Sequence, residues 1–335
     1  MSRGYIDGKT NEEIIGDIGF GSPVVMDDYA KKKVLITGAG SYIGESFRKY
    51  AEENYKENFY IDTIDMIDGS WRDKSFDSYD IVYHVAGIAH ADIGDVSDDV
   101  IEKYYKINTD LAIEVAKKSK EDNVKQFIFM SSMIVYGGSD AYEKGQSINK
   151  NTVPKAANFY GDSKLQADVA VRELAEENFK VIVIRPPMIY GQNSRGNYPV
   201  LAKLAKTLPL FPDINNKRSM LHIDNFCEFL CQIMLINMYS RNAVVLIPQN
   251  AEWTKTSEMV KEIAKLSNNS ILILSILNPV VDIMGIIPGK IGCLVKKAFG
   301  SSYYDKELSE YPGLDYIKYS LAESIARTEG DCYEK

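Results

Sequence analysis

Apolar and polar positions follow two different periods along residues 33–184, and their alternation predicts a sheet covered by helices. Short runs rich in Val and Ile are followed by longer stretches in which apolar residues recur three or four positions apart. The runs predict strands at Val34–Thr37, Tyr60–Ile64, Asp80–Ala86, Gln126–Met130 and Lys180–Ile184. The longer stretches predict helices at Ile43–Tyr55, Asp98–Lys120 and Phe159–Glu177. This order indicates an α/β fold with a Rossmann-type, doubly wound parallel sheet.

The pattern changes after Arg185, where a second region begins. Two prolines interrupt it, and residues 190–198 are rich in Gly, Asn and Ser. There follow an amphipathic stretch at Pro199–Thr207, a predicted short strand at Ser219–Ile223, a predicted helix at Asn225–Met238 and a predicted strand at Ala243–Ile247. We therefore divide the chain into a flexible N-terminal extension (1–31), a main α/β domain (32–186) and a smaller region interleaved with it (187–335).

The composition indicates a globular protein and disfavours several classes of function. The chain has 335 residues, of which 45% are hydrophobic, enough for a large core. Its formal net charge of -8 gives no general attraction to nucleic acid or to an anionic membrane. Four cysteines without CxxC spacing and three histidines (His84, His90 and His222) predict neither a disulfide framework nor a metal site. Cys227 and Cys231 are expected to be buried thiols, and a reducing compartment, the cytoplasm, fits this usage.

The most apolar stretch of the chain is Ile271–Ile287. It is interrupted by Asn278, Pro279 and Asp282 and falls short of the roughly 20 apolar residues that a membrane helix needs. We expect it to be buried structure, with contact to a membrane surface or a partner as the alternative. The acidic N-terminus lacks the basic and apolar order of a secretory signal.

A glycine-rich turn, Thr37-Gly-Ala-Gly-Ser-Tyr-Ile-Gly44, joins the first predicted strand to the first predicted helix. Glycine permits a tight turn and a close approach of the backbone to a pyrophosphate, while the helix N-terminus offers unpaired N–H groups. The turn therefore predicts dinucleotide binding by Gly38, Gly40, Ser41, Tyr42, Ile43 and Gly44. Serine at 41, where the spacing TGxxGxxG would place glycine, indicates a slightly reshaped turn.

An acidic residue follows the second predicted strand, where the adenosine ribose of a dinucleotide should lie. Asp65 can accept a hydrogen bond from the 2'-hydroxyl and would repel a 2'-phosphate, which favours NAD over NADP. Asp62, within the same strand, is the alternative.

Tyr160 and Lys164 lie four residues apart at the start of the third predicted helix and hence on one helix face. A nearby ammonium favours phenolate over phenol, so we expect Lys164 to lower the pKa of Tyr160 and make it an acid/base catalyst. Ser131 and Ser132 follow the strand Gln126–Met130, at the sheet edge where ligands of open α/β sheets bind. Ser132 is our candidate for donating to a substrate oxygen.

Together these motifs resemble extended short-chain dehydrogenases/reductases, above all the nucleotide-sugar 4-epimerases. The resemblance spans roughly residues 32–329 and rests on TGAGSYIG, His84-Val-Ala-Gly87, Ile107-Asn108, SSMIVYG, YGDSK and Arg185-Pro-Pro-Met-Ile-Tyr-Gly191, which occur in the family's order. It implies that Ser132, Tyr160 and Lys164 are catalytic. It further implies that NAD is contacted by Val85, Ala86, Gly87, Asn108, Ser131, Tyr160, Lys164 and Pro187. Residues 187–335 would then mainly bind substrate.

The resemblance also implies a reaction. Tyr160 would take the proton of a sugar 4-hydroxyl while hydride passes to NAD, and hydride would return to the opposite face of the 4-keto sugar. The substrate would be a UDP-linked hexose for surface polysaccharide synthesis, with Arg218 at the diphosphate, Asn197 at the nucleotide and Ser132 at the sugar. A homodimer formed through residues 98–120 and 159–177 is also implied.

Two other functions use the same residues. A nucleotide-sugar 4-keto reductase would run one hydride transfer with NAD(P)H, and a catalytically silent dinucleotide sensor would only bind the cofactor. The intact set of Ser132, Tyr160 and Lys164 argues against the sensor. Met133 and Ile134 occupy the positions where 4,6-dehydratases of this family carry an acidic pair, so dehydration is disfavoured because neither side chain can carry a proton.

Overall fold

The centre of the molecule is a parallel sheet of six strands. A computed structural model describes residues 8–14, 31–89, 96–137, 146–236, 241–287 and 289–330. The strand order is β10-β6-β4-β3-β1-β2, and every pairing in this sheet is parallel. The bounds are β1 (Lys32–Thr37), β2 (Phe59–Ile64), β3 (Ile81–His84), β4 (Gln126–Met130), β6 (Lys180–Ile184) and β10 (Ala243–Leu246).

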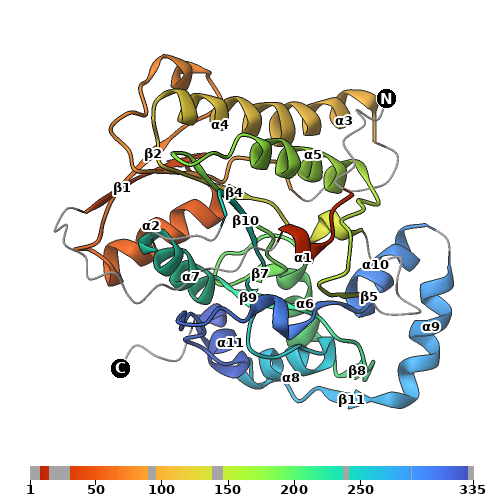
Figure 1. Ribbon diagram of the computed structural model, residues 1–335. Coiled ribbons are helices and arrows are strands. Elements are labelled where there is room, and N and C mark those ends of the chain that lie inside the picture. Colours follow the sequence, from red (N-terminus) through yellow and green to blue (C-terminus); the bar gives the residue numbers. More distant parts are fainter. Residues whose placement is uncertain are drawn as a thin grey trace.

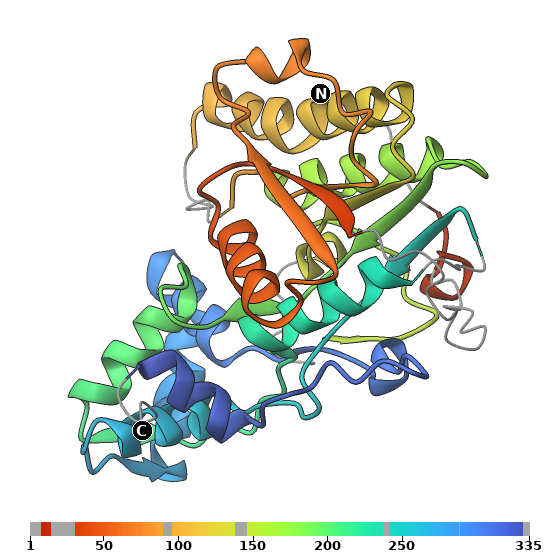
Figure 2. The same cartoon turned by 90° about the vertical axis from the view of Figure 1, so that its left-hand side faces the viewer.

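Helices cover both faces of this sheet, as the doubly wound pattern predicts (Figures 1 and 2). One face carries α3 (Asp98–Tyr105), α4 (Leu111–Glu121) and α5 (Phe159–Glu173), with the π-helical turn η2 (Lys106–Asp110) joining the first two. The other face carries α2 (Tyr42–Asn54) and α7 (Ile223–Leu235). The predicted fold class is confirmed.

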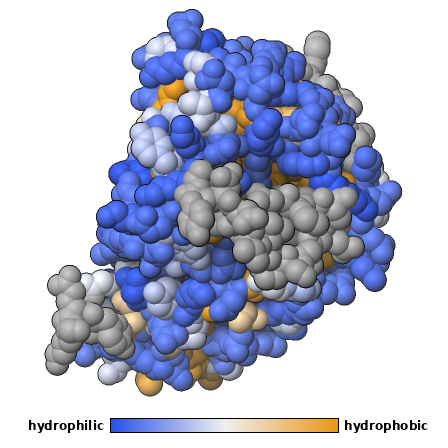
Figure 3. All heavy atoms as spheres, turned by 60° about the vertical axis from the view of Figure 1, so that its left-hand side comes forward, coloured by the Kyte–Doolittle hydropathy of each residue, from blue (hydrophilic) through white to orange (hydrophobic). Residues whose placement is uncertain are grey.

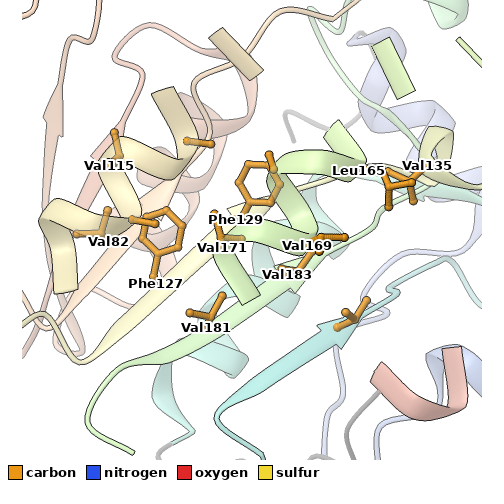
Figure 4. Close-up of a cluster of buried hydrophobic side chains, with 14 of the residues drawn as sticks. Val82, Val115, Phe127, Phe129, Val135, Leu165, Val169, Val171, Val181 and Val183 are labelled. Carbon is orange, nitrogen blue, oxygen red and sulfur yellow. The ribbon is translucent and has the colours of Figure 1, made fainter. Parts of the chain in front are cut away.

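Successive side chains of each strand enter two separate apolar clusters, because a pleated strand presents them to opposite faces. Val34 and Ile36 of β1 pack toward α2 and α7, whereas Leu35 between them packs toward α4 and α5. The cluster that contains Leu35 also contains Phe127 and Phe129 of β4 (Figure 4). Both faces of these strands are buried, so their sequences are apolar runs without polar alternation.

A smaller C-terminal unit packs beside the carboxyl ends of the strands. It contains helices α6 (Asn197–Thr207), α8 (Thr256–Leu266), α9 (Asn278–Ile286), α10 (Lys290–Phe299) and α11 (Leu321–Glu329). Among the described residues, three parallel strand pairs lie outside the main sheet: β7 (Met188–Tyr190) with β9 (Met220–His222), β8 (Leu210–Pro212) with β11 (Leu272–Leu274), and β5 (Gln146–Ile148) with β12 (Ser302–Tyr304). Tyr190, Phe211 and Val260 belong to a third apolar cluster there.

The two regions are interleaved. Helix α7 and strand β10 come from the C-terminal half of the chain, yet they complete the covering layer and the edge of the main sheet. At the other end, α1 (Asn11–Ile14) lies within the predicted flexible extension but is packed: Ile14 is buried, and Tyr136 donates to Asn11 at 2.5 Å. The expectation of flexibility is therefore wrong for residues 8–14, because an apolar and an amide side chain anchor them.

Several predicted element ends shift. The strand predicted at Asp80–Ala86 is regular only over Ile81–His84, and the helix predicted to reach Glu177 ends at Glu173. Expected burial of residues 271–287 is wrong for many of their side chains, since Leu272, Ile276, Val280, Ile283 and Ile286 are exposed. The structure describes no helix that is both long enough and apolar enough to cross a membrane.

Candidate active site

The glycine turn after β1 packs tightly against the loop after β3. Gly38 has φ +100°, and a Cβ there would lie 2.9 Å from the main chain of Ala86. Gly40 has φ +75°, a conformation that favours glycine. The main-chain N–H groups of Gly38 and Ala39 both donate to the carbonyl of Ile64, at 2.9 and 3.1 Å. These contacts fix the turn at the N-terminus of α2.

Ser41 begins helix α2 and explains how the turn departs from the glycine spacing. It has φ −70°, which any residue adopts, and its hydroxyl accepts from the N–H of Gly44 at 3.3 Å as an N-cap. A Cβ at Gly44 would come within 2.6 Å of the same Oγ. Serine therefore replaces a flexible glycine with a capping residue, while the other glycines keep the turn tight.

The structure separates the two candidates for the ribose contact. Asp65 directly follows Ile64, whose carbonyl binds the glycine turn, and its carboxylate is exposed at the carboxyl end of β2. It accepts from the N–H of Ile67 at 2.7 Å. Asp62 lies inside β2 opposite Leu35 and accepts from the hydroxyl of Tyr79 at 2.7 Å. The position of Asp65 supports its predicted role, and Asp62 is already engaged within the sheet.

Three predicted dinucleotide contacts have side chains that pack into the protein. Tyr42, Ile43 and Val85 lie against the apolar cluster beneath α2 and α7. Burial raises the pKa of the Tyr42 hydroxyl, and a Cβ at Gly191 would lie 2.8 Å from it. Any contact of Tyr42 or Ile43 with a pyrophosphate would therefore use main-chain N–H groups at the start of α2.

Gly87, Asn108 and Lys164 meet beside the carboxyl end of β3. A Cβ at Gly87 would lie 3.0 Å from both the Asn108 side-chain oxygen and Lys164 Nζ. Asn108 is fully buried in the π-helical turn, accepts from the N–H of Ile88 at 2.8 Å and donates to the hydroxyl of Ser163 at 3.1 Å. Asn108 thus holds the loop after β3 against α5, behind the predicted catalytic pair.

Lys164 is buried at the centre of the site. Its ammonium donates to the carbonyl of Met130 at 2.9 Å and lies 5.0 Å from the ring centroid of Phe129. Desolvation lowers the pKa of Lys164 to about 8, against the opposing attraction of Asp168. The amine can therefore change charge near neutrality.

Tyr160 lies beside Ser132, as predicted, but its pKa does not follow the prediction. Desolvation raises the pKa of Tyr160 to about 12, and a hydrogen bond with Ser132 opposes this rise. The expected lowering by Lys164 is wrong for this structure, because Lys164 donates to Met130 and burial dominates. The ring of Tyr104 packs edge-on against Tyr160 with centroids 5.9 Å apart, so α3 helps to fix the phenol.

A buried ion pair lies behind α5, the helix that carries Tyr160 and Lys164. Asp168, one turn after Lys164, accepts from Arg185 Nε and Nη2, both at 2.8 Å, and from Arg172 Nε at 3.0 Å. Arg185 also donates to the Tyr136 hydroxyl at 2.8 Å. The two arginines hold the pKa of Asp168 at about 2 despite its burial. Sequence reasoning missed this pair, although an acid four residues after the lysine was a visible signal.

The remaining cofactor candidates lie along the same edge. Ser131 is buried, and its N–H donates to the carbonyl of Ile184 at 2.9 Å. Pro187 is buried next to Pro186, whose carbonyl accepts from the N–H of Met133 at 2.9 Å. The segments after β4 and β6 are thereby joined around Ser132.

The C-terminal unit contacts the segment after Ser132 through β12. Ser302 donates to the sulfur of Met133 at 3.3 Å, and Ser302 also bridges to Arg218 in the backbone. This contact brings the segment that carries Arg218, just before β9, close to Met133, the residue after Ser132. Sequence reasoning missed Ser302 because nothing in its local sequence marks it.

Arg218 is a desolvated cation at the end of a helix. Its Nη1 donates to the carbonyls of Lys297 and Ala298 in the last turn of α10, and desolvation lowers its pKa to about 10. Within the described ranges no carboxylate forms an ion pair with it. Capping of α10 is thus an observed role, and diphosphate binding stays a prediction. Asn197 is exposed at the start of α6, and its predicted role also stays untested.

The histidines and cysteines give no sign of metal chemistry where they are described. His84 is buried against the Thr37 hydroxyl at 2.7 Å, and desolvation lowers its pKa to about 3. Cys227 and Cys231 are buried thiols in α7, whereas His90 lies outside the described residues. Over the described part of the chain, no three His, Cys, Asp or Glu side chains are placed to hold a metal ion.

Comparison with known proteins decides the family. Residues 34–244 match the model of the NAD dependent epimerase/dehydratase family. The chain belongs to this family. Its cofactor is NAD, as the sequence resemblance implied, and the family consists of enzymes. The glycine turn fits this cofactor, since Gly38 and Gly40 have positive φ and the turn ends at the N-terminus of α2, whose main-chain N–H groups can bind a pyrophosphate. The exposed carboxylate of Asp65 lies at the carboxyl end of β2, next to this turn.

Two curated relatives resemble about half of the chain. A UDP-glucose 4-epimerase of Vibrio cholerae is 31% identical over 188 residues, which are 55% of this chain and 56% of the relative. An N-acetyl-alpha-D-glucosaminyl-diphospho-ditrans,octacis-undecaprenol 4-epimerase of Escherichia coli O157:H7 is 28% identical over 214 residues, 59% of this chain and 61% of the relative. In both cases the match covers less than two thirds of the relative's length.

A solved structure extends the likeness of the fold over most of the chain. MoeE5 in complex with UDP-glucuronic acid and NAD aligns with 88% of this chain and 97% of its own, with a TM-score of 0.64 and 18% identity. The C-terminal unit is therefore part of the shared fold.

Proposed function

We propose that the protein is an NAD-dependent 4-epimerase of a diphosphate-linked hexose, with a UDP-sugar as the first candidate substrate. The observation that carries the proposal is the set of Ser132, Tyr160 and Lys164 at one sheet edge, followed by Met133 and Ile134 in place of an acidic pair. Such a site can move one proton at a sugar hydroxyl but has no group to remove a second proton for dehydration.

Each residue has a defined part in this proposal. NAD supplies the acceptor and donor of hydride when bound. Ser132 donates to the sugar oxygen, and Tyr160 takes and returns the proton of the 4-hydroxyl. Lys164 stabilises the phenolate once its contact with Met130 loosens, and Asn108 keeps the loop at Gly87 in place. Arg218 offers a guanidinium that lacks a carboxylate partner among the described residues, which suits a diphosphate.

The physiological setting belongs to the same proposal. We infer a place in sugar-nucleotide or surface-polysaccharide metabolism within the cytoplasm. A homodimer through α3, α4 and α5 is proposed by likeness to the family alone. The side of α5 that faces α3 and α4 is already packed within one chain, so a dimer interface would use the outer sides of these helices.

The first experiment identifies the cofactor and the reaction together. The purified protein is denatured and any released dinucleotide is identified by mass, while native protein is incubated with UDP-glucose and UDP-N-acetylglucosamine without added cofactor. Copurified NAD with formation of the 4-epimer is the expected result. If the protein releases no dinucleotide and reduces a 4-keto sugar only when NAD(P)H is added, it is a 4-keto reductase and not an epimerase.

A second set of reactions tests the carrier of the sugar. Because the Escherichia coli relative is named for a polyprenol-linked substrate, N-acetylglucosamine diphosphoundecaprenol in detergent is compared with UDP-N-acetylglucosamine. If only the lipid-linked sugar is epimerised, the protein is still a 4-epimerase, but its substrate carries undecaprenyl diphosphate in place of UDP.

A further inference from the structure

Helix α9 and the 3-10 turn η5 (Ser275–Leu277) expose apolar side chains that a soluble protein normally buries. Ile276 is 81% exposed and Ile286 is 76% exposed, and Val280, Ile283 and Ile287 are also exposed. Asp282 is the one charged residue of α9, and Val281 and Gly285 are its buried positions. A helix that is apolar nearly all round is ordinarily covered by protein or by lipid. We call Ile276, Val280, Ile283, Ile286 and Ile287 the apolar face.

The apolar face is concentrated in one place. The large hydrophobic residues exposed in the main α/β part, such as Ile67, Val100 and Val153, are far apart in the sequence. The side of the molecule in Figure 3 is largely hydrophilic, whereas α9 stands at the edge of the molecule in Figure 1. Among the described elements α9 packs chiefly on α10 and η5. Isolated exposed apolar residues are normal, but a continuous group of them marks an interaction site.

Basic residues accompany the apolar face. Between Glu262 and Asp305 the sequence contains Lys265, Lys290, Lys296 and Lys297, with Asp282 as the sole acidic residue. The chain as a whole has a formal net charge of -8, so this segment has the opposite sign from the molecule. Lys296 and Lys297 lie in α10, the helix that packs on α9, whereas Lys265 forms an ion pair with Glu262. An apolar face with lysines on the neighbouring helix matches the acyl and headgroup layers of an anionic membrane.

We propose that the apolar face docks on the surface of an anionic phospholipid bilayer. The helix has nine residues and is about 14 Å long, too short to span the hydrocarbon core, so it would lie in the interface. A second copy of the chain is the alternative occupant, and the test below distinguishes it by the oligomeric state. The inference goes beyond the proposed epimerase reaction and does not depend on it.

Docking at this face would place the diphosphate candidate near the membrane. Arg218 donates to the last carbonyls of α10, and α10 packs against α9. The helix that packs on the lipid-facing α9 therefore also contacts the arginine of the proposed substrate site. A bound membrane would lie beside the C-terminal unit and not beside β2 at the far edge of the sheet.

The test measures binding of the full chain to vesicles by cosedimentation. Vesicles of phosphatidylcholine and phosphatidylglycerol (7:3) are compared with phosphatidylcholine alone. We expect binding to the anionic vesicles, weakened by salt. The combined variant Ile276→Ser, Ile283→Ser and Ile286→Ser should lose at least about tenfold in affinity. The control variant Ile67→Ser with Val153→Ser, which alters exposed apolar residues elsewhere, should bind like the wild type.

Three outcomes would overturn the proposal. Wild-type protein that fails to bind either vesicle would do so, as would equal binding by the serine variant and the wild type. The third is a wild-type oligomer in sedimentation velocity that the serine substitutions dissociate while vesicle binding stays unchanged, since a second copy would then cover the face. Because the substituted side chains are exposed, thermal melts of all variants should coincide, and Lys296→Gln with Lys297→Gln tests the charge separately.

Discussion

Lys164 donates a hydrogen bond of 2.9 Å to the main-chain carbonyl of Met130, the last residue of β4. The bond holds a cation in a desolvated position, where its pKa falls to about 8 from the ordinary 10.5. Between these two pH values the unfolded chain binds more protons than the folded one, so the contribution of Lys164 to stability improves as pH rises. Below pH 8 the buried charge disfavours folding.

Replacement of Lys164 measures how much its buried charge lowers the free energy of unfolding. The free energy of unfolding of the wild type, relative to Lys164→Met, should rise by about 2 kcal/mol between pH 7 and pH 10. Urea denaturation of both proteins at the two pH values measures the difference, in which other titrating groups largely cancel. If the difference in free energy of unfolding between the two proteins does not change with pH, Lys164 is exposed to water in solution. The variant should also be inactive.

Tyr160→Phe separates proton transfer from cofactor binding. The substitution removes the hydroxyl that contacts Ser132 while the ring can keep its edge-on contact with Tyr104. We expect turnover to fall by at least about 100-fold and NAD affinity to stay within about threefold of the wild type. Assay of the 4-epimer together with titration of NAD by calorimetry would measure both. Turnover at the wild-type rate would remove Tyr160 from the mechanism.

Asp65→Ala tests the choice of dinucleotide. Loss of a charged acceptor at the ribose should weaken NAD by about tenfold and reduce the discrimination against NADP, whose 2'-phosphate the carboxylate repels. Binding of both dinucleotides is measured on protein stripped of cofactor. Asp62→Ala is the matched control, because Asp62 is held by Tyr79 inside β2. A change of preference in the control alone would move the ribose contact.

The sequence predicted the layered fold well because its strands are buried on both faces. Val34, Leu35 and Ile36 form an uninterrupted apolar run, and the structure places them in two clusters on opposite faces of the sheet. Ends of elements were less predictable: the N–H of Val85 still donates to the carbonyl of Thr37 at 3.2 Å, but the regular strand β3 ends at His84. There, contact with the glycine turn decides the conformation, and a local pattern does not record such contacts.

The apolar segment at residues 271–287 shows where pattern reasoning fails. Its composition resembles that of a core helix, yet α9 lies at the edge of the molecule and its apolar side chains are exposed. The hydrophobicity of a segment predicts that its side chains favour an apolar environment, but it does not tell whether the rest of the protein or another surface provides that environment.

For the site, the motifs placed Tyr160, Lys164 and Ser132 together, but neither the raised pKa of Tyr160 nor the contact of Ser302 with Met133 follows from spacing.

The ion pair of Asp168 with Arg185 gives a prediction about stability. Both side chains are fully buried, and the arginines hold the pKa of Asp168 at about 2, below the ordinary 3.8. A depressed carboxyl pKa contributes stability above about pH 4 that is lost as pH falls through the folded-state value. Asp168→Asn should therefore lower the free energy of unfolding at pH 7 by about 3 kcal/mol, because it leaves Arg185 as an uncompensated buried charge.

The difference between wild type and Asp168→Asn should shrink as pH falls from about 4 toward 2, where the wild-type carboxyl also becomes neutral. Urea denaturation across this range measures it. Glu52→Gln is the matched control, since Glu52 is exposed and pairs with Arg48 at 3.1 Å on the surface of α2. That change should alter stability by less than about 0.5 kcal/mol. Equal effects of the two substitutions at pH 7 would show that burial gives the Asp168–Arg185 pair no special weight. Because Asp168 also favours the charged form of Lys164, its loss should move the titration of Lys164 to lower pH.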